Sequence, residues 1–160
     1  ALVDQRTQNR SKRWTAGTAL PGGDFAVLSF ETLVIEAQRH FAFADPLLVR
    51  RLARLYGTEV WALLKDCEQI CDLGTHFGAG LYQVEVDYLV REEWARLAQD
   101  IIYRRTKLGL RMTIEEISAL EQYLDTLHFL QDASVDQRVA DLSPDVDSAQ
   151  TAEAVGHLLS

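Results

Sequence analysis

The sequence lacks long apolar runs, an excess of basic residues and a secretion signal. No stretch approaches the roughly 20 consecutive apolar residues of a membrane-spanning helix. The first residues are polar or charged, where a signal peptide needs an apolar segment. The net charge is −8, opposite in sign to a surface that binds DNA or RNA. These absences predict a cytoplasmic protein that does not bind nucleic acid.

Cysteine is also scarce, and the acidic C-terminal part lacks the residues of a calcium site. Cys67 and Cys71 stand four apart with His76 nearby, but three candidate ligands without a fourth make a poor zinc site. We expect two reduced, half-buried thiols instead. A calcium loop in the acidic part would need glycine at its sixth position and glutamate at its twelfth. Gln150 and Gly156 stand there, so we expect no metal ion.

Charge and composition divide the chain into three parts. Residues 1–23 are mostly polar and end in Leu-Pro-Gly-Gly, which cannot continue a helix, so we expect an extended arm. Residues 24–130 contain the apolar pattern of a helical domain. Residues 131–160 carry six acids against the single Arg138. That composition predicts an acidic tail, with a short terminal helix and partial disorder as the two alternatives.

Apolar residues at three- and four-residue spacing predict the first helices. One should begin at Asp24 as its N-cap. Its apolar face would consist of Val27, Phe30, Val34, Ala37 and Phe41. A second should begin at Asp45-Pro46 and stop at Gly57, and Thr58 should cap a third. The inward stripe of the second helix would be Leu48, Leu52 and Leu55, with Arg50, Arg51 and Arg54 facing elsewhere.

The middle of the chain is less clearly marked. Residues 72–80 contain three glycines and predict a loop. The apolar positions from Leu81 to Ile102 fit either one bent helix or two helices joined near residues 90–92. The sequence leaves both alternatives open.

The last predicted helix, at 112–130, has the strongest signals. Thr113 and Glu116 have the spacing of a capping box, and Met112 and Ile117 occupy the positions of a hydrophobic staple. Its buried face would be Ile117, Leu120, Leu124 and Leu127. Because no stretch alternates with the period of a strand, we predict an all-α fold. We expect a single compact bundle of five to six helices with an extended N-terminal arm.

The chain has no motif that would place a catalytic or cofactor site in it. Gly78-Ala79-Gly80 comes nearest to a dinucleotide-binding turn, but Gln83 replaces the third glycine and no strand precedes it. A phosphate-binding Walker loop, a nucleophile elbow and a zinc-binding histidine pair are absent from the sequence. We therefore assign no catalytic, cofactor-binding or metal-binding residue in this chain.

A cluster of positive charge closes the middle region. Asp100 and Arg104 stand four apart and can pair on a helix surface. Arg104, Arg105 and Lys107 would occupy the last turn, where positive charge complements the helix dipole. Gly109 would then stop the helix. Spacing favours this structural interpretation, with a site for an anion or partner as the alternative.

The segment "EVDYLVREEWARLAQDIIYRRTKLGL" at 85–110 resembles the C-terminal helical domain of the FAD-dependent, aerobic glycerol-3-phosphate dehydrogenases. The signature residues are Glu85, Tyr88, Glu93, Ala95, Asp100, Arg104, Arg105 and Thr106. Three further pieces match in order: "WTAGTALPGGDF" at 14–25, "RLARLYGTE" at 51–59 and "DLGTHFGAGLYQVEVDYLV" at 72–90. The resemblance covers about residues 14–127.

This resemblance implies a bacterial-type parent flavoprotein of glycerol metabolism that oxidises glycerol 3-phosphate to dihydroxyacetone phosphate. Its FAD and substrate would lie in an N-terminal domain of the same chain, joined to this domain through residues 1–23. Electrons would pass to quinone, with the parent peripheral to the inner membrane on the cytoplasmic side. The start at Ala1 and the single methionine fit a segment of a longer protein, or ordinary N-terminal trimming. A homodimer is one alternative for its assembly.

Two hypotheses follow for this chain itself. The first is a non-catalytic accessory domain, in which Glu85, Tyr88, Glu93, Asp100, Arg104, Arg105 and Thr106 have structural or interdomain roles. The second is a free-standing helical protein-interaction module that shares only the fold. Within the first, we expect Asp100 to hold Arg104, while Arg105 pairs either inside the domain or with the N-terminal domain. We favour pairing inside the domain.

Overall fold

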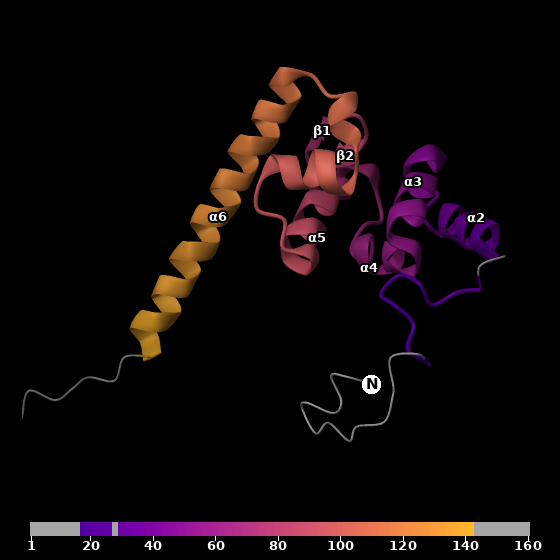
Figure 1. Cartoon of the computed structure of the whole chain (residues 1–160), viewed down its shortest axis with the longest axis horizontal. Helices are drawn as coiled ribbons and strands as arrows, with labels where there is room; N and C mark the ends of the chain where they lie inside the picture. The colour runs from indigo at the N-terminus through magenta and orange to yellow at the C-terminus, as the bar shows by residue number, and fades with distance from the viewer. Residues whose placement is uncertain (1–16, 27–28, 143–160) are drawn as a thin grey trace, which may run out of the picture.

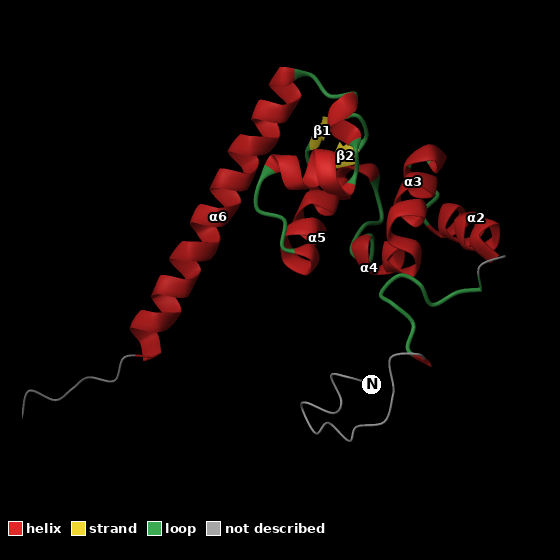
Figure 2. Cartoon of the chain, in the orientation of Figure 1, coloured by secondary structure: helices red, strands yellow, loops and turns green. Residues whose placement is uncertain are grey.

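A computed structural model describes residues 17–26 and 29–142 of the chain, and five α-helices form most of this part (Figures 1 and 2). They are α2 (Phe30–His40), α3 (Pro46–Tyr56), α4 (Val60–Leu63), α5 (Gln83–Glu93) and α6 (Ile114–Leu142). Short 3-10 turns lie at Gly57–Glu59, Ile70–Leu73 and Leu108–Leu110, and a π-helix at Asp100–Arg105. The predicted all-α class is confirmed, with a two-stranded hairpin of β1 (His76–Gly78) and β2 (Leu81–Tyr82) added to it.

Helix α2 begins at Phe30, so the predicted N-cap at Asp24 is wrong. Gly23 N donates to Leu20 O at 2.8 Å and Phe25 N donates to Gly23 O at 2.9 Å. These turns occupy the backbone on both sides of Asp24, and the helix starts only after them. The predicted inward face is otherwise confirmed at Val34, Ala37 and Phe41, which are buried, while Val27 lies outside the described residues.

Helix α3 has the predicted start and end. Asp45 Oδ1 accepts a hydrogen bond from Leu47 N at 2.7 Å, Pro46 is the first helical residue, and Gly57 ends the helix with a φ of 57°. Its buried face differs from the predicted stripe and consists of Leu48, Val49, Leu52, Ala53 and Tyr56. That face is rotated toward Val49 and Tyr56, which leaves Leu55 at 42% exposure.

The third helix, α4, has only four residues, and Thr58 does not cap it. A 3-10 turn at Gly57–Glu59 precedes it. Thr58 N donates to Gly22 O at 3.0 Å, so the backbone of Thr58 serves the N-terminal segment rather than the helix start. Val60, Leu64 and Cys67 are buried, so the expectation of a half-buried thiol is wrong for Cys67.

The predicted loop at 72–80 contains a β-hairpin. His76 pairs with Tyr82 across two antiparallel strands, and Ala79 and Gly80 form the turn with φ angles of 50° and 81°. Strands of three and two residues are too short for their alternating pattern to be seen in a sequence. Before the hairpin, Asp72 Oδ2 accepts hydrogen bonds from Glu68 N and Gln69 N at 2.9 and 2.8 Å.

The segment after the hairpin forms two helices, which decides between the two alternatives that the sequence left open. Helix α5 ends at Glu93, and Trp94 adopts the left-handed conformation with a φ of 55°. Helix resumes at Ala98 and becomes the π-helix at Asp100–Arg105. Gly109 is not the stop: Lys107 takes the left-handed conformation, and Gly109 lies inside the following 3-10 turn.

Helix α6 begins with the predicted capping box. Thr113 N donates to Glu116 Oε2 at 2.8 Å, and Glu116 N donates to Thr113 Oγ1 at 3.3 Å. Leu120 and Leu124 are buried, and Ile117 and Leu127 pack on the core from its edge. The helix continues to Leu142, past the domain boundary that the sequence places at 130, and this end extends away from the other elements (Figure 1).

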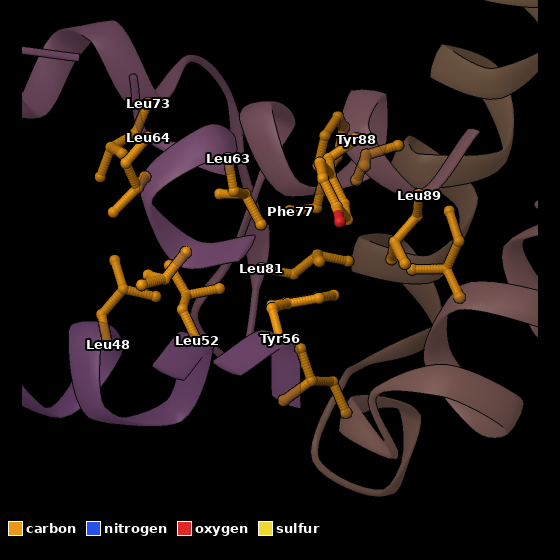
Figure 3. Packing of buried hydrophobic residues seen from close by; sticks show 14 of the residues in the cluster. Leu48, Leu52, Tyr56, Leu63, Leu64, Leu73, Phe77, Leu81, Tyr88 and Leu89 are labelled. Atoms are coloured by element: carbon orange, nitrogen blue, oxygen red, sulfur yellow. The ribbon is translucent and has the colours of Figure 1, made fainter. Parts of the chain in front are cut away.

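The core joins α3, α4, the hairpin, α5 and the start of α6. Figure 3 shows Leu48 and Leu52 of α3 facing Leu63 of α4 and the following Leu64, with Tyr56 and Leu81 between these and Leu89. Leu52, Leu64, Leu81 and Leu89 are almost completely buried. No described helix is both long and apolar enough to cross a membrane.

Candidate functional site

A buried ion pair connects α3, the hairpin turn and α5. Glu85 is 1% exposed, and its two oxygens accept from Arg51 Nη1 at 2.8 Å and Arg51 Nη2 at 2.6 Å. Tyr56 Oη donates to Glu85 Oε1 at 2.8 Å, and Arg51 Nη2 also donates to Gly80 O at 2.6 Å. A charge taken out of water is tolerated only when it is paired and hydrogen-bonded, and these contacts meet that condition.

The electrostatics of this network favour a fixed charge arrangement. Burial, together with the Glu85 carboxylate, raises the pKa of Tyr56 well above its ordinary value. Burial acts to lower the pKa of Arg51, but its hydrogen bonds to Glu85 and the charge of that carboxylate raise it. Tyr56 is thus a neutral hydrogen-bond donor and Arg51 a permanent cation. The network holds α3, the hairpin turn and α5 together.

The sequence identified one side of this network and missed the other. Glu85 belongs to the predicted structural residues, whereas Arg51 was expected to face away from the core, which is wrong. A usable signal existed, because Arg51 lies three positions after the buried Leu48 and so shares its side of the helix. The sequence assigns no role to Tyr56 beyond its place in the segment at 51–59 that resembles the family.

Tyr88, the second signature residue, lies beside the network. It is buried and packs edge-on against Tyr56, with ring centroids 5.4 Å apart. Burial, followed by the charge of the neighbouring Glu59, raises the pKa of Tyr88. Tyr88 belongs to the hydrophobic core.

Glu93 and Arg105 bridge the break between the two helices. Arg105 Nη2 donates to Glu93 O at 2.8 Å, and Arg105 Nη1 forms an ion pair with the Glu93 carboxylate. The two side chains are 39% and 30% exposed. Arg105 therefore pairs inside the domain, as favoured from the sequence, although its partner is half-exposed and not a buried carboxylate.

Asp100 organises the start of the π-helix. Its Oδ2 accepts from Leu97 N at 3.0 Å and Arg96 N at 3.2 Å, and its Oδ1 accepts from Arg104 Nη1 at 2.9 Å. These backbone hydrogen bonds, followed by the nearby Arg104 charge, lower the pKa of Asp100. The predicted pairing of Asp100 with Arg104 is present.

Thr106 closes the other end of the π-helix. Its hydroxyl donates to Ile101 O at 2.8 Å, and its backbone N–H donates to the same oxygen at 2.9 Å. Lys107 Nζ donates to Tyr103 O at 2.5 Å. The cations of this cluster all donate to acceptors of the domain itself, which favours the structural interpretation over an anion site.

The segment Leu20–Gly23 packs on the end of α3. Gly22 and Gly57 meet backbone to backbone, both with positive φ, and a Cβ at Gly57 would collide with Gly22 O. Beside this contact lies a cavity of about 670 Å³, which we call the linker cavity. Its lining includes Leu20, Phe25, Leu55, Glu59, Tyr88 and Glu92.

The glycine-rich turn at 78–80 is the described segment that comes nearest to a dinucleotide-binding motif. Gly78-Ala79-Gly80 turns between antiparallel strands, and a Cβ at Gly78 would collide with the Glu116 carboxylate, an unsuitable neighbour for a phosphate. FAD therefore does not fit this turn. Cys67 is buried and Cys71 exposed, both as free thiols. In the part of the chain that the structure describes, no cluster of three His, Cys, Asp or Glu side chains could hold a metal.

Comparison with known proteins gives a consistent result. A family model described as the C-terminal domain of alpha-glycerophosphate oxidase matches residues 13–132. A glycerol-3-phosphate dehydrogenase of Pseudomonas aeruginosa is 45% identical over 75% of this chain. An aerobic glycerol-3-phosphate dehydrogenase of Escherichia coli is 35% identical over 69% of it. A D-erythritol 1-phosphate dehydrogenase of Brucella abortus is 35% identical over 73% of it. The matches span only 23%, 22% and 23% of these relatives.

Proposed function

The chain belongs to the family described as the C-terminal domain of alpha-glycerophosphate oxidase, and on that premise we propose that it is the accessory domain of an FAD-dependent glycerol-3-phosphate dehydrogenase. The observation that carries this proposal is the family match over residues 13–132, together with 45% identity to a relative of that name. The chain itself is non-catalytic in this proposal. Its role is structural, in the folding and assembly of the parent.

The parent chain oxidises the secondary alcohol of glycerol 3-phosphate to dihydroxyacetone phosphate. FAD would lie in a domain that precedes this one and would supply the redox chemistry, with quinone as the final electron acceptor. The parent is a cytoplasmic protein bound peripherally to the inner membrane. The resemblance of the signature at 85–110 to the FAD-dependent dehydrogenases supports the cofactor, and the bacterial relatives support the type of parent.

The contacts of the signature residues support a structural role. Glu85 holds α3 and the hairpin turn against α5, and Glu93 with Arg105 holds the two helices on either side of Trp94. Asp100 and Thr106 bond the two ends of the π-helix. Glu85, Glu93, Asp100, Arg104 and Arg105 each form a hydrogen bond or an ion pair within this domain.

The test compares the full-length parent with this 160-residue chain. We expect the full-length protein to carry FAD and to reduce a quinone analogue with glycerol 3-phosphate as substrate, at a higher kcat/KM than with D-erythritol 1-phosphate. The 160-residue chain should show no flavin absorption and no turnover. Preference for erythritol phosphate would overturn the substrate. Flavin bound to the short chain would overturn the accessory role, and a full-length protein without FAD would favour an interaction module.

A further inference from the structure

The linker cavity lies where the chain enters the domain. Leu20–Gly23 is held at the end of α3 by the hydrogen bond from Thr58 N to Gly22 O, and by the close contact of Gly22 with Gly57. Because both glycines need positive φ and lack room for a Cβ, this attachment has a fixed geometry. The direction from which a preceding domain connects is therefore set at this edge of the molecule.

The reach of the chain keeps a preceding domain close to the cavity. The family match is to a C-terminal domain and begins at residue 13, so most of each relative precedes it. The family match begins seven Cα–Cα steps before Leu20, a span of at most about 25 Å when fully extended. A preceding domain joined through residues 1–23 is therefore tethered to the segment whose Leu20 lines the cavity.

The cavity exposes apolar side chains that this domain does not cover. Leu20 is 79% exposed. Leu55 of α3 is also exposed, whereas Leu48 and Leu52 of the same helix are buried. Leu20 and Leu55 line the cavity, as does the half-buried Phe25. Leucines grouped around a cavity of about 670 Å³ are typical of a binding surface, whereas single exposed leucines need no explanation.

The charge of the lining points to the chemistry of the partner surface. Glu59, Glu92 and Glu93 face one cation, Arg54. Glu93 pairs with Arg105 and Glu92 pairs with the adjacent Arg91, which leaves Glu59 and Arg54 as the remaining charges of the lining. These two charges are opposite in sign, so a complementary surface is mainly apolar.

We propose that the linker cavity is the surface on which the preceding domain of the parent docks, with an apolar segment that contacts Leu20, Phe25 and Leu55. This inference rests on the proposed function, because it takes the preceding domain from there. It adds the place of contact and the chemistry of the contacting surface.

Hydrogen exchange measured by mass spectrometry tests the proposal on the full-length parent and on this 160-residue chain. We expect amides of residues 53–59 and 88–93 to exchange at least about tenfold more slowly in the full-length protein. Amides around Leu47, at the opposite end of α3, should exchange equally in both. Equal exchange at the cavity would overturn the proposal, and so would protection that depends on the concentration of the short chain, which would indicate a second copy.

Two matched variants separate docking from folding. Leu55→Glu and Leu47→Glu each place an acid at an exposed leucine of α3, but only Leu55 lines the linker cavity. Both should leave the unfolding of the short chain unchanged. In the full-length protein only Leu55→Glu should raise the exchange rate of the amides at the cavity, by about tenfold. If protection persists in Leu55→Glu, the proposal is wrong. Turnover of glycerol 3-phosphate is measured separately. If the full-length protein does not turn over this substrate but the amides at the cavity remain protected, the proposed function is wrong and the proposed interface stands.

Discussion

Two ion pairs of the same family signature differ in their surroundings. Glu85 is almost completely buried and is held by Arg51 and Tyr56, whereas Glu93 and Arg105 meet on a half-exposed surface. The buried pair connects segments 34 residues apart, and the surface pair connects the ends of two successive helices 12 residues apart. Glu85 and Glu93 are both glutamates of the same signature, but their different burial gives their ion pairs different effects on stability.

The difference follows from solvation. Removing one partner of a buried pair leaves an unpaired charge in the protein interior, which costs several kcal/mol. Removing one partner of an exposed pair returns the other to water, which solvates it. We therefore expect Arg51 and Glu85 to determine whether the domain folds, and Arg105 and Glu93 to adjust the angle between α5 and the π-helix.

The largest effect is expected for Arg51→Met. This change leaves the Glu85 carboxylate buried with only Tyr56 as a partner, and we expect a loss of about 3–5 kcal/mol in the free energy of unfolding, measured in urea. The matched control is Arg50→Met on the same helix, where Arg50 pairs with the exposed Glu31 and little change is expected. Equal losses in the two variants would mean that burial does not distinguish the pairs.

Tyr56→Phe should have the next largest effect. It removes one hydrogen bond to a charged acceptor, for which we expect a loss of about 1.5–3 kcal/mol. The pKa of Tyr56 is raised in the folded state, so its contribution is complete below the unfolded pKa of about 10 and is lost as the pH rises above it. Urea unfolding between pH 9 and pH 11 should therefore show a shallower decline in stability for Tyr56→Phe than for the wild type. An identical decline would contradict the assignment.

Arg105→Ala should cost less than either. The pair with Glu93 is half-exposed, so we expect less than about 1 kcal/mol in urea unfolding. Arg104→Ala is the matched control, since its partner Asp100 also accepts two backbone hydrogen bonds and the arginine is more exposed. A loss near that of Arg51→Met would show that Arg105 is as important to the fold as the buried pair.

Asp100→Asn should give the smallest change, visible mainly in acid. The pKa of Asp100 is lowered in the folded state by hydrogen bonds from Leu97 N and Arg96 N. Its contribution is present above the unfolded pKa of about 3.9 and is lost as the pH falls through the lower folded value. Thermal melts between pH 5 and pH 2 should show a slightly weaker acid dependence for the variant. A stronger dependence would contradict the sign.

Local signals predicted the parts of the fold whose partners are near in the sequence. The cap of α3 by Asp45 and the capping box of Thr113 and Glu116 are present, because each depends on residues two or three positions apart. The pairing of Asp100 with Arg104 also follows from spacing alone. These interactions could be identified before the structure was known.

Interactions between distant segments were harder to predict. The partner of Glu85 lies 34 residues earlier, and a single sequence gives no register between α3 and α5. The hairpin was missed because its strands are too short to show a period. The helix break came at Trp94, a residue with no particular tendency toward positive φ. The hydrogen bond from Ala95 N to Leu89 O and the Glu93–Arg105 pair stabilise the chain there.

The most direct test of the account is a pair of double-mutant cycles on the 160-residue chain in urea. One cycle combines Arg51→Met with Glu85→Leu, and the other combines Arg105→Met with Glu93→Leu. We predict a coupling energy above about 2 kcal/mol for the buried pair, and below about 1 kcal/mol for the surface pair. Equal coupling energies, or a larger one for Arg105 and Glu93, would contradict the claim that the Arg51–Glu85 contact holds the domain together.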